Sequence, residues 1–200
     1  MFAKMINELE FHEEEHIYSL NGKIVTNVTR VLSPLVSFHM VDPVKLENAR
    51  RKGVAVHKMV ELWCQDDLDE ASLPEWMVPV LDQWKLFVEM TRFKVLESES
   101  RVYHKTFGYA GTLDLFGIIN EKDHAIIDLK RSFAAGDVIG YQTAAYAEAH
   151  EKTNKKCKRF ALKLREDGHF KLKEYKDKND FTHFLTCLNW HRLQEKHRGK

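Results

Sequence analysis

Cysteine is scarce in this sequence: Cys64, Cys157 and Cys187 are its three cysteines, and they lie far apart with no C-x-x-C pair. Such isolated cysteines argue against a disulfide framework, a zinc knuckle or a cysteine-held iron–sulfur cluster. No run approaches the ~20 apolar residues that a membrane-spanning helix needs. Residues 1–16 include an acidic run and no apolar core of a secretory signal. We therefore expect a protein of the cytoplasm, with no membrane partner.

Neither sign of charge dominates, because 31 Lys and Arg stand against 30 Asp and Glu, for a formal net charge of +1. That balance hides an asymmetry along the chain. Residues 61–100 hold ten acidic and three basic side chains, whereas residues 151–176 hold ten basic and four acidic ones. A local basic face can hold phosphates even where the total charge is near zero. The basic segment is thus either a nucleic-acid contact or a solvated strand face rich in lysine.

The order of the expected elements predicts an α/β or α+β fold with a central mixed sheet flanked by helices. A hairpin is expected over residues 16–26, where Asn21-Gly22 suits a tight turn. Hydrophobic periodicity predicts helices over 44–65, 74–92, 137–151 and 180–197, and strands over 94–104, 112–119, 125–129, 159–164 and 169–175. The length suits a single domain over residues 1–200, with an N-terminal hairpin and a helical elaboration.

Two further expectations concern the helices. Gly53 lies inside the helix predicted over 44–65, where it costs about 1 kcal/mol relative to alanine and so could mark a close approach. The last helix is amphipathic, and its apolar side chains are expected to enter the core. These side chains are Phe181, Phe184, Leu185, Leu188 and Trp190.

The most informative pattern is the segment AGTLD over residues 110–114, followed by Asp128-Leu129-Lys130. Side chains alternate along a strand, so Asp128 and Lys130 share one face about 6–7 Å apart, and Leu129 points into the core. Such charges are costly to bury without partners or a metal. Two carboxylates could hold Mg²⁺ or Mn²⁺ for phosphodiester hydrolysis. The lysine would orient the attacking water or help to deprotonate it.

Four motifs in this order resemble the RecB-like and phage-type exonucleases of the PD-(D/E)XK nuclease superfamily. The motifs are Gly53-x-x-x-His57, Gly111-x-x-Asp114, Asp128-x-Lys130 and Gln142-x-x-x-Tyr146. The N-terminal hairpin leading into residues 28–32 is also similar to the opening of phage exonucleases of this type. The resemblance spans residues 16–146 and implies a restriction-endonuclease-like core.

The resemblance also implies roles for single residues. The metal ligands would be His57, Asp114, Asp128 and the carbonyl of Leu129, and Glu99 is a further candidate because relatives often carry an active-site glutamate before the first aspartate. Lys130 would be the catalytic lysine. Gln142 and Tyr146, on one helical face, would reach toward the lysine or the DNA. Taken alone, His57 would more often be a buried structural histidine, and its spacing from Gly53 favours the ligand instead. Glu61, one helical turn beyond His57, could reach the same metal but is more typical of a solvated helix glutamate. Arg131 stands where the family usually has threonine.

The function expected from these features is a Mg²⁺- or Mn²⁺-dependent DNA exonuclease that leaves 5′-phosphates, in DNA recombination, repair or phage DNA processing. The alternatives are a structure-selective endonuclease with the same metal core and a non-catalytic nucleic-acid-binding protein. No G-x-x-x-x-G-K-[ST] motif occurs, so a helicase or single-strand-annealing partner would be a separate chain. The hairpin expected over 159–175 would contact single- or double-stranded DNA through paired basic side chains. These are Lys163, Arg165, Lys171 and Lys173.

Overall fold

The computed structural model of the chain describes residues 9–13, 15, 17–36, 42–153 and 157–198. Its strands are β1 Leu9–His12, β2 Ile17–Leu20, β3 Lys23–Asn27, β4 Lys94–His104, β5 Tyr109–Ile119, β6 Asp123–Leu129, β7 Lys158–Lys163 and β8 Lys171–Glu174. Its α-helices are α1 Val28–Leu32, α2 Pro43–Cys64, α3 Val78–Thr91, α4 Val138–Ala149 and α5 Asp180–Arg198. Short 3₁₀ turns, η1 Ser33–Leu35, η2 Glu70–Ser72 and η3 Glu75–Met77, connect them.

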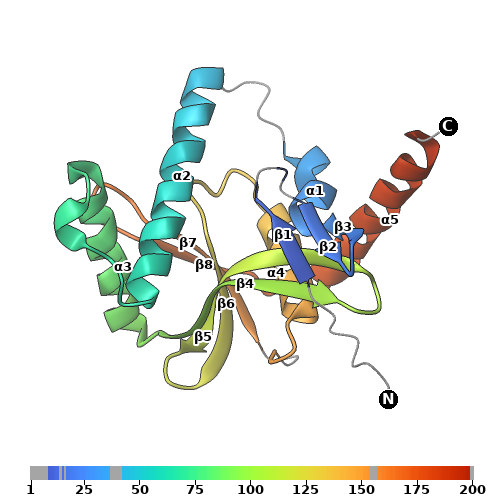
Figure 1. Cartoon of the computed structure of the whole chain (residues 1–200). Helices are drawn as coiled ribbons and strands as arrows, with labels where there is room; N and C mark the ends of the chain where they lie inside the picture. Colours follow the sequence, from blue (N-terminus) through green and yellow to red (C-terminus); the bar gives the residue numbers. More distant parts are fainter. Residues whose placement is uncertain (1–8, 14, 16, 37–41, 154–156, 199–200) are drawn as a thin grey trace, which may run out of the picture.

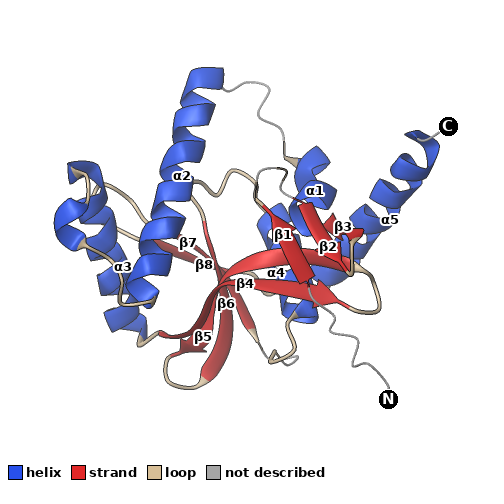
Figure 2. Ribbon diagram, viewed as in Figure 1, coloured by secondary structure: helices blue, strands red, loops and turns tan. Residues whose placement is uncertain are grey.

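The described strands form one eight-stranded mixed sheet, with helices on both of its faces (Figure 1, Figure 2). The strand order is β1-β2-β3-β5-β6-β7-β8, and β4 pairs with β5 beside this row. β3 runs parallel to β5 and β6 runs parallel to β7, whereas the other pairs are antiparallel. The predicted α/β fold with a central mixed sheet is confirmed.

Alternation along β6 decides which residues face which helices. Ala125, Ile127 and Leu129 join the buried cluster formed with α2 and α3, whereas Ile126 joins the cluster formed with α1, α4 and α5. The sheet is therefore sealed on both faces, as an α/β core with a parallel crossover requires. Asp128 shares its parity with Ile126, so a carboxylate stands at a position where an apolar side chain would be expected.

Several local features differ from the sequence-based expectations. β1 is an extra edge strand that no pattern indicated, and the segment over 28–32 is a helix. Asn27 caps this helix, because its side-chain oxygen accepts the N–H groups of Thr29 and Arg30. The expectation for Trp190 was wrong: its side chain is 59% exposed, since the inner face of α5 is completed by Phe184 and Leu188. His16 of the expected hairpin, and Lys155 and Lys156 of the basic segment, lie outside the described residues.

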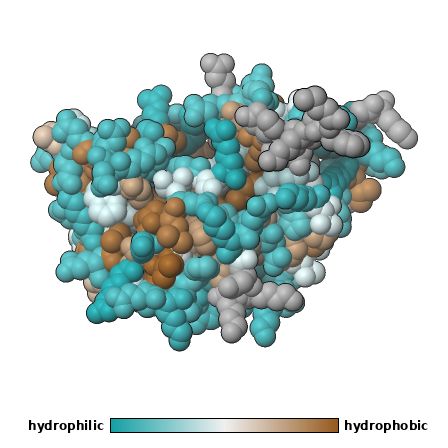
Figure 3. Space-filling model, turned by 60° about the horizontal axis from the view of Figure 1, so that its bottom comes forward, coloured by the Kyte–Doolittle hydropathy of each residue, from teal (hydrophilic) through white to brown (hydrophobic). Residues whose placement is uncertain are grey.

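Hydrophilic residues cover most of the face seen in Figure 3, with one hydrophobic patch left of its centre. Exposed large apolar side chains of the described residues are distributed over several elements, such as Ile24 on β3, Val54 on α2 and Met90 on α3. Single exposed apolar residues are ordinary on protein surfaces. None of the helices in the described part is long and apolar enough to span a membrane.

A pair of glycines tests how tightly the layers pack. A methyl group at Gly117 would stand 2.3 Å from the backbone oxygen of Lys94, so we expect Gly117→Ala to destabilise the protein by about 2 kcal/mol or more. At Gly53 the nearest atom would be Cγ of Arg131 at 3.5 Å, an ordinary contact. The close approach expected at Gly53 therefore leaves room for alanine. Gly53→Ala should be neutral or stabilising by up to about 1 kcal/mol, because alanine favours the helix. Urea unfolding of both variants measures the difference.

Candidate metal centre

The site lies where β5 and β6 diverge. Their paired residues run from Ile119 opposite Asp123 to Leu115 opposite Ile127. One residue further on, Oδ2 of Asp114 accepts the backbone N–H of Leu129 at 2.6 Å. A buried carboxylate thus takes the place of the next backbone partner, because an N–H group left unpaired in the interior would be costly. This bond fixes Asp114 on the sheet.

Three metal-ligating side chains converge beside this gap. His57 comes from α2, and its Nδ1 lies 3.2 Å from Oε1 of Glu99 and 3.7 Å from Oδ1 of Asp114. Its Nε2 lies 3.1 Å from the carbonyl oxygen of Leu129. One ligand atom from each of His57, Glu99 and Asp114 lies within 4.8 Å of the other two, so the group could hold a metal ion. The structure thus brings together four of the five sequence-predicted metal ligands.

Glu99 reaches this group through an unusual backbone conformation. Its φ is 46°, in the left-handed region, although it lies inside β4. The other described non-glycine residues with positive φ lie in turns or at a helix end: Asn21, Asp66, Arg92, Asn120 and Glu121. Left-handed backbone costs about 1–2 kcal/mol for a residue with a side chain. Strain of this kind gathers at functional sites, where the surrounding structure maintains it. It supports Glu99 as a member of the site.

The fifth predicted ligand, Asp128, forms an ion pair with Lys130. Its carboxylate is almost fully buried, and its Oδ2 lies 2.7 Å from Nζ of Lys130. The other oxygen, Oδ1, is buried and has no hydrogen-bond partner among the described residues. The expected alternation is confirmed here, because Leu129 between them points into the core. A buried carboxylate oxygen without a donor fits a position that awaits a cation.

Burial and mutual attraction shift the titration of these groups. Burial raises the pKa of Asp128 to about 6 and also raises that of Asp114. Burial alone would lower the pKa of His57, but the carboxylates of Asp114 and Glu99 raise it to about 9. The same two effects act on Lys130, where Asp128 and Asp114 prevail and raise the pKa. The two carboxylates thus favour the ammonium form of Lys130.

Gln142 and Tyr146 lie beneath the strand that carries Asp114. Nε2 of Gln142 donates to the Tyr146 hydroxyl at 3.0 Å, and Tyr146 is only 2% exposed. Its ring fills the space above Gly111, where a Cβ would stand 2.5 Å from the ring. The glycine of the second motif is thus needed for the tyrosine of the fourth. Tyr146 thus packs against Gly111, and a contact of Gln142 or Tyr146 with the lysine or DNA stays a prediction.

One residue beside the site had no signal in the sequence. Tyr18 of β2 is buried, and its hydroxyl lies 2.7 Å from the hydroxyl of Thr112. This bond joins the N-terminal hairpin to β5 two residues before Asp114. Only the fold shows the pairing, because 94 residues separate the two side chains.

The basic hairpin shares the Asp128 face of the sheet. Asp128 lies beside Ala161, which is opposite Lys173, and Lys163 is opposite Lys171. Side chains paired across neighbouring strands point to one face. Lys163 and Lys171 have no ion-pair partner among the described residues, whereas Nζ of Lys173 lies 4.5 Å from the centre of the Tyr175 ring. Unlike these lysines, Arg165 is paired with Asp167.

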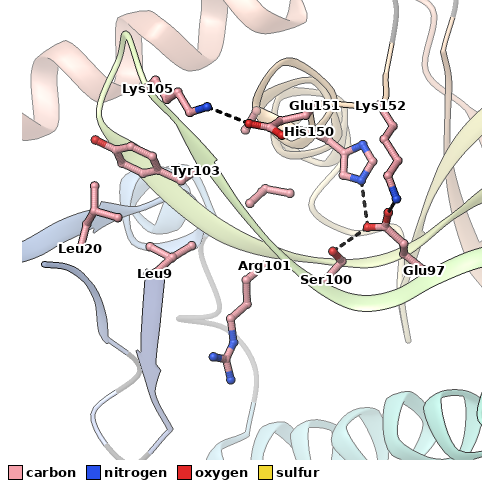
Figure 4. A pocket seen from close by; sticks show the side chains of 12 residues that line it. Leu9, Leu20, Glu97, Ser100, Arg101, Tyr103, Lys105, His150, Glu151 and Lys152 are labelled. Carbon is pink, nitrogen blue, oxygen red and sulfur yellow. Dashed lines mark hydrogen bonds and ion pairs between the residues drawn. The ribbon is translucent and has the colours of Figure 1, made fainter. Parts of the chain in front are cut away.

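A separate, wider pocket lies between the β1–β2 hairpin, β4 and the end of α4 (Figure 4). Glu97 points toward it, but its oxygens are taken by Lys152 at 2.6 Å, His150 at 3.0 Å and Ser100 at 2.7 Å. Burial opposes ionisation of Glu97, yet these donors lower its pKa to about 2. The carboxylate is thus fully engaged within the protein and is not part of the metal centre.

Comparison with known proteins finds only distant likeness. The sequence matches no protein-family model and no curated protein. Among solved structures, the chain is similar to LHK-Exo in complex with dAMP, at 14% identity and a TM-score of 0.39, covering 87% of this chain and 89% of the other. It is also similar to the alkaline exonuclease LHK-Exo from Laribacter hongkongensis, at 14% identity and a TM-score of 0.32, covering 88% and 93%. We derive no function from likeness at this level.

The strained backbone at Glu99 yields a test that separates ligand loss from strain relief. Glu99→Gln and Glu99→Gly should both weaken Mn²⁺ binding by about tenfold or more, because each removes an anionic oxygen. The glycine variant should be more stable than the glutamine variant by about 1 kcal/mol, since glycine adopts positive φ without penalty. Calorimetric Mn²⁺ titration and urea unfolding measure the two effects.

Glu121 provides the matched control. It also has a positive φ, of 58°, but lies in the turn between β5 and β6 and pairs with Arg92. Glu121→Gly should stabilise the protein to a similar degree and leave Mn²⁺ binding unchanged. Equal Mn²⁺ affinity of wild type and Glu99→Gln would remove Glu99 from the metal centre.

Proposed function

We propose that the chain is a metal-dependent nuclease that hydrolyses phosphodiester bonds of DNA. The observation that carries the proposal is the convergence of His57, Glu99 and Asp114 within 4.8 Å, beside a buried aspartate–lysine pair. Charged groups gathered in the interior are costly unless something binds there. Hydrolysis of a phosphodiester requires a metal-activated water molecule and positive charge near the phosphate. The carboxylates could hold the metal ion, and the ammonium group supplies positive charge beside it.

The donor set fits Mg²⁺ or Mn²⁺. Carboxylate and carbonyl oxygens suit both ions, and an imidazole nitrogen shifts the preference toward Mn²⁺. The residues that would hold the ion are His57, Glu99, Asp114 and the carbonyl of Leu129, and the unpartnered Oδ1 of Asp128 is a further donor. When bound, the metal would acidify a water molecule and neutralise charge on the phosphate.

The protein's own groups contribute position and charge. The N–H of Leu129 holds one oxygen of Asp114, so the other is directed toward His57. Asp128 holds Lys130 in place, and the ammonium group can donate to the phosphate or to the departing oxygen as negative charge develops there. Groups fixed before the reaction need no reorganisation when the charge develops, which is the main source of electrostatic catalysis.

The motif resemblance supports a DNA exonuclease that leaves 5′-phosphates. A structure-selective endonuclease would have the same centre, whereas a purely binding protein would have no need of the aspartate–lysine pair. Incubation with end-labelled single- and double-stranded oligonucleotides, and with covalently closed circular DNA, in Mg²⁺ or Mn²⁺ separates these activities. Cleavage of the closed circle would favour the endonuclease, and the absence of cleavage of every substrate would overturn the proposed function.

Replacing Lys130 tests the assignment of the ammonium group. We expect Lys130→Gln to lower the cleavage rate on the order of 10²–10³-fold, because the charge that stabilises the transition state is removed. Glutamine can still donate to buried Asp128, which Lys130→Ala would leave as an unpaired charge. Lys122→Gln, an exposed lysine in the turn between β5 and β6, is the matched control and should keep its cleavage rate near that of the wild type. Near wild-type turnover of Lys130→Gln would contradict the assignment.

We further propose that the β7–β8 hairpin contacts the DNA backbone. The register places Lys163 and Lys171 successively beside the Lys130 position, at strand spacings of about 5 Å. Their ammonium groups have no ion-pair partner among the described residues, so binding phosphate costs them no existing pair. Arg165 would have to exchange Asp167 for phosphate.

A charge reversal measures this interaction. The double variant Lys171→Glu and Lys173→Glu should bind DNA more weakly, with a salt slope smaller in magnitude by about one unit for each phosphate that the hairpin no longer neutralises. Its Mn²⁺ affinity should stay unchanged. The control is the double variant Lys85→Glu and Lys94→Glu, which changes the net charge by the same amount. Its two positions lie on α3 and at the start of β4, outside the hairpin. Fluorescence anisotropy over a salt series in EDTA gives the slopes, and identical slopes for both double variants would leave the hairpin without a role in binding.

A further inference from the structure

A second group of charges lies next to the metal centre. One carboxylate oxygen, Oε1 of Glu166, lies 2.9 Å from Nζ of Lys52 and 3.0 Å from Nη2 of Arg131. The three residues come from three different parts of the chain: α2, the segment after β6 and the turn between β7 and β8. Two cations from distant segments therefore converge on a single oxygen atom.

This group adjoins the proposed catalytic residues. Arg131 follows Lys130 directly in the chain. The same small pocket is lined by Arg131, Lys130 and Leu129 on one side and by His57 and Gly53 of α2 on the other. Arg131 thus lines the pocket beside the metal centre, and Lys52 is joined to it through Glu166.

Each cation also has a neighbour other than Glu166. Nζ of Lys52 lies 4.7 Å from the centre of the Trp76 ring, a cation–π contact that holds the ammonium group. Cγ of Arg131 would be 3.5 Å from a Cβ at Gly53, so the Arg131 side chain lies close to the surface of α2. All three charged side chains are between 29% and 39% exposed. A ligand from solvent can therefore reach them.

We infer that Lys52 and Arg131 form a phosphate-binding site for the DNA strand, and that Glu166 closes this site in the free protein. The inference rests on the proposed function, which it deepens by naming the residues that hold the phosphate next to the one that is cleaved. The Glu166 carboxylate stands in for phosphate oxygens, and a phosphate offers more acceptor oxygens and charge. An arginine guanidinium can bind two of those oxygens at once.

The competing explanation is a clamp that only fastens the hairpin turn to α2. Partly exposed ion pairs contribute little to stability, with a median of about 0–1 kcal/mol. A clamp predicts that removing the Glu166 charge lowers stability and leaves DNA binding unaffected. A closed phosphate site predicts that the same change strengthens DNA binding, because phosphate no longer competes with a carboxylate.

Glu166→Gln tests the inference, with a fluorescent 5′-phosphorylated oligonucleotide as probe in EDTA, where no cleavage occurs. We expect the affinity to rise about three- to tenfold, which corresponds to releasing two exposed ion pairs. Glu174→Gln is the matched control, since it removes one carboxylate from β8 that pairs with Lys176. Its affinity should change by much less than that of Glu166→Gln.

A second set of variants separates a specific site from a general change in charge. Lys52→Gln and Arg131→Gln should each weaken binding, and the gain from Glu166→Gln should disappear when both cations are replaced. Unchanged affinity of Glu166→Gln, or a gain that persists without Lys52 and Arg131, would overturn the inference. If this pattern holds while the wild type cleaves no substrate, the phosphate site stands and the proposed function fails. If cleavage occurs without this pattern, only the inference fails.

Discussion

The bond from the Leu129 N–H to the Asp114 carboxylate is the interaction on which the site depends. It lies where the backbone pairing between β5 and β6 stops. The side chain of Asp114 accepts the N–H group of Leu129 there, in place of a backbone carbonyl. The same bond directs the second oxygen of Asp114 toward His57 on α2. Asp114 thereby connects β5 with β6 through this hydrogen bond and with α2 through His57. The site is part of the core's hydrogen-bond pattern and is not an addition to its surface.

Charge balance explains why the centre tolerates burial. Glu99, Asp114 and Asp128 bring three carboxyl groups, whereas His57 and Lys130 bring two cationic ones. The carboxylates of Asp114 and Glu99 raise the pKa of His57, and its imidazolium can donate to Glu99 and to the Leu129 carbonyl at once. A divalent cation among these acceptors would take over that role and supply the missing positive charge. The residues thus fit a metal centre both in donor type and in charge.

How far the sequence predicts this arrangement depends on the range of the interactions. Alternation along one strand was sufficient to place Asp128 and Lys130 together with Leu129 in the core. The left-handed backbone that turns Glu99 toward His57, and the bond between Tyr18 and Thr112, arise from contacts between distant segments, and local patterns do not contain them. Trp190 is a further example. The sequence indicates which apolar side chains of a helix could be buried, but the packing of neighbouring elements decides which of them are buried.

Acidic side chains around the site restrain its cations unevenly. Glu166 and Asp167, neighbours in one turn, engage Lys52, Arg131 and Arg165, whereas Lys163 and Lys171 have no such partner among the described residues. A protein with nearly equal numbers of both charges can therefore present a basic strip on one hairpin and keep other cations paired until a stronger anion arrives. Such pairing lowers the affinity for any polyanion, because each new ion pair requires an old one to break. The turn would then favour ligands that bind Lys163 and Lys171 as well as Lys52 and Arg131. Ligands that reach only one of these two pairs would bind less well.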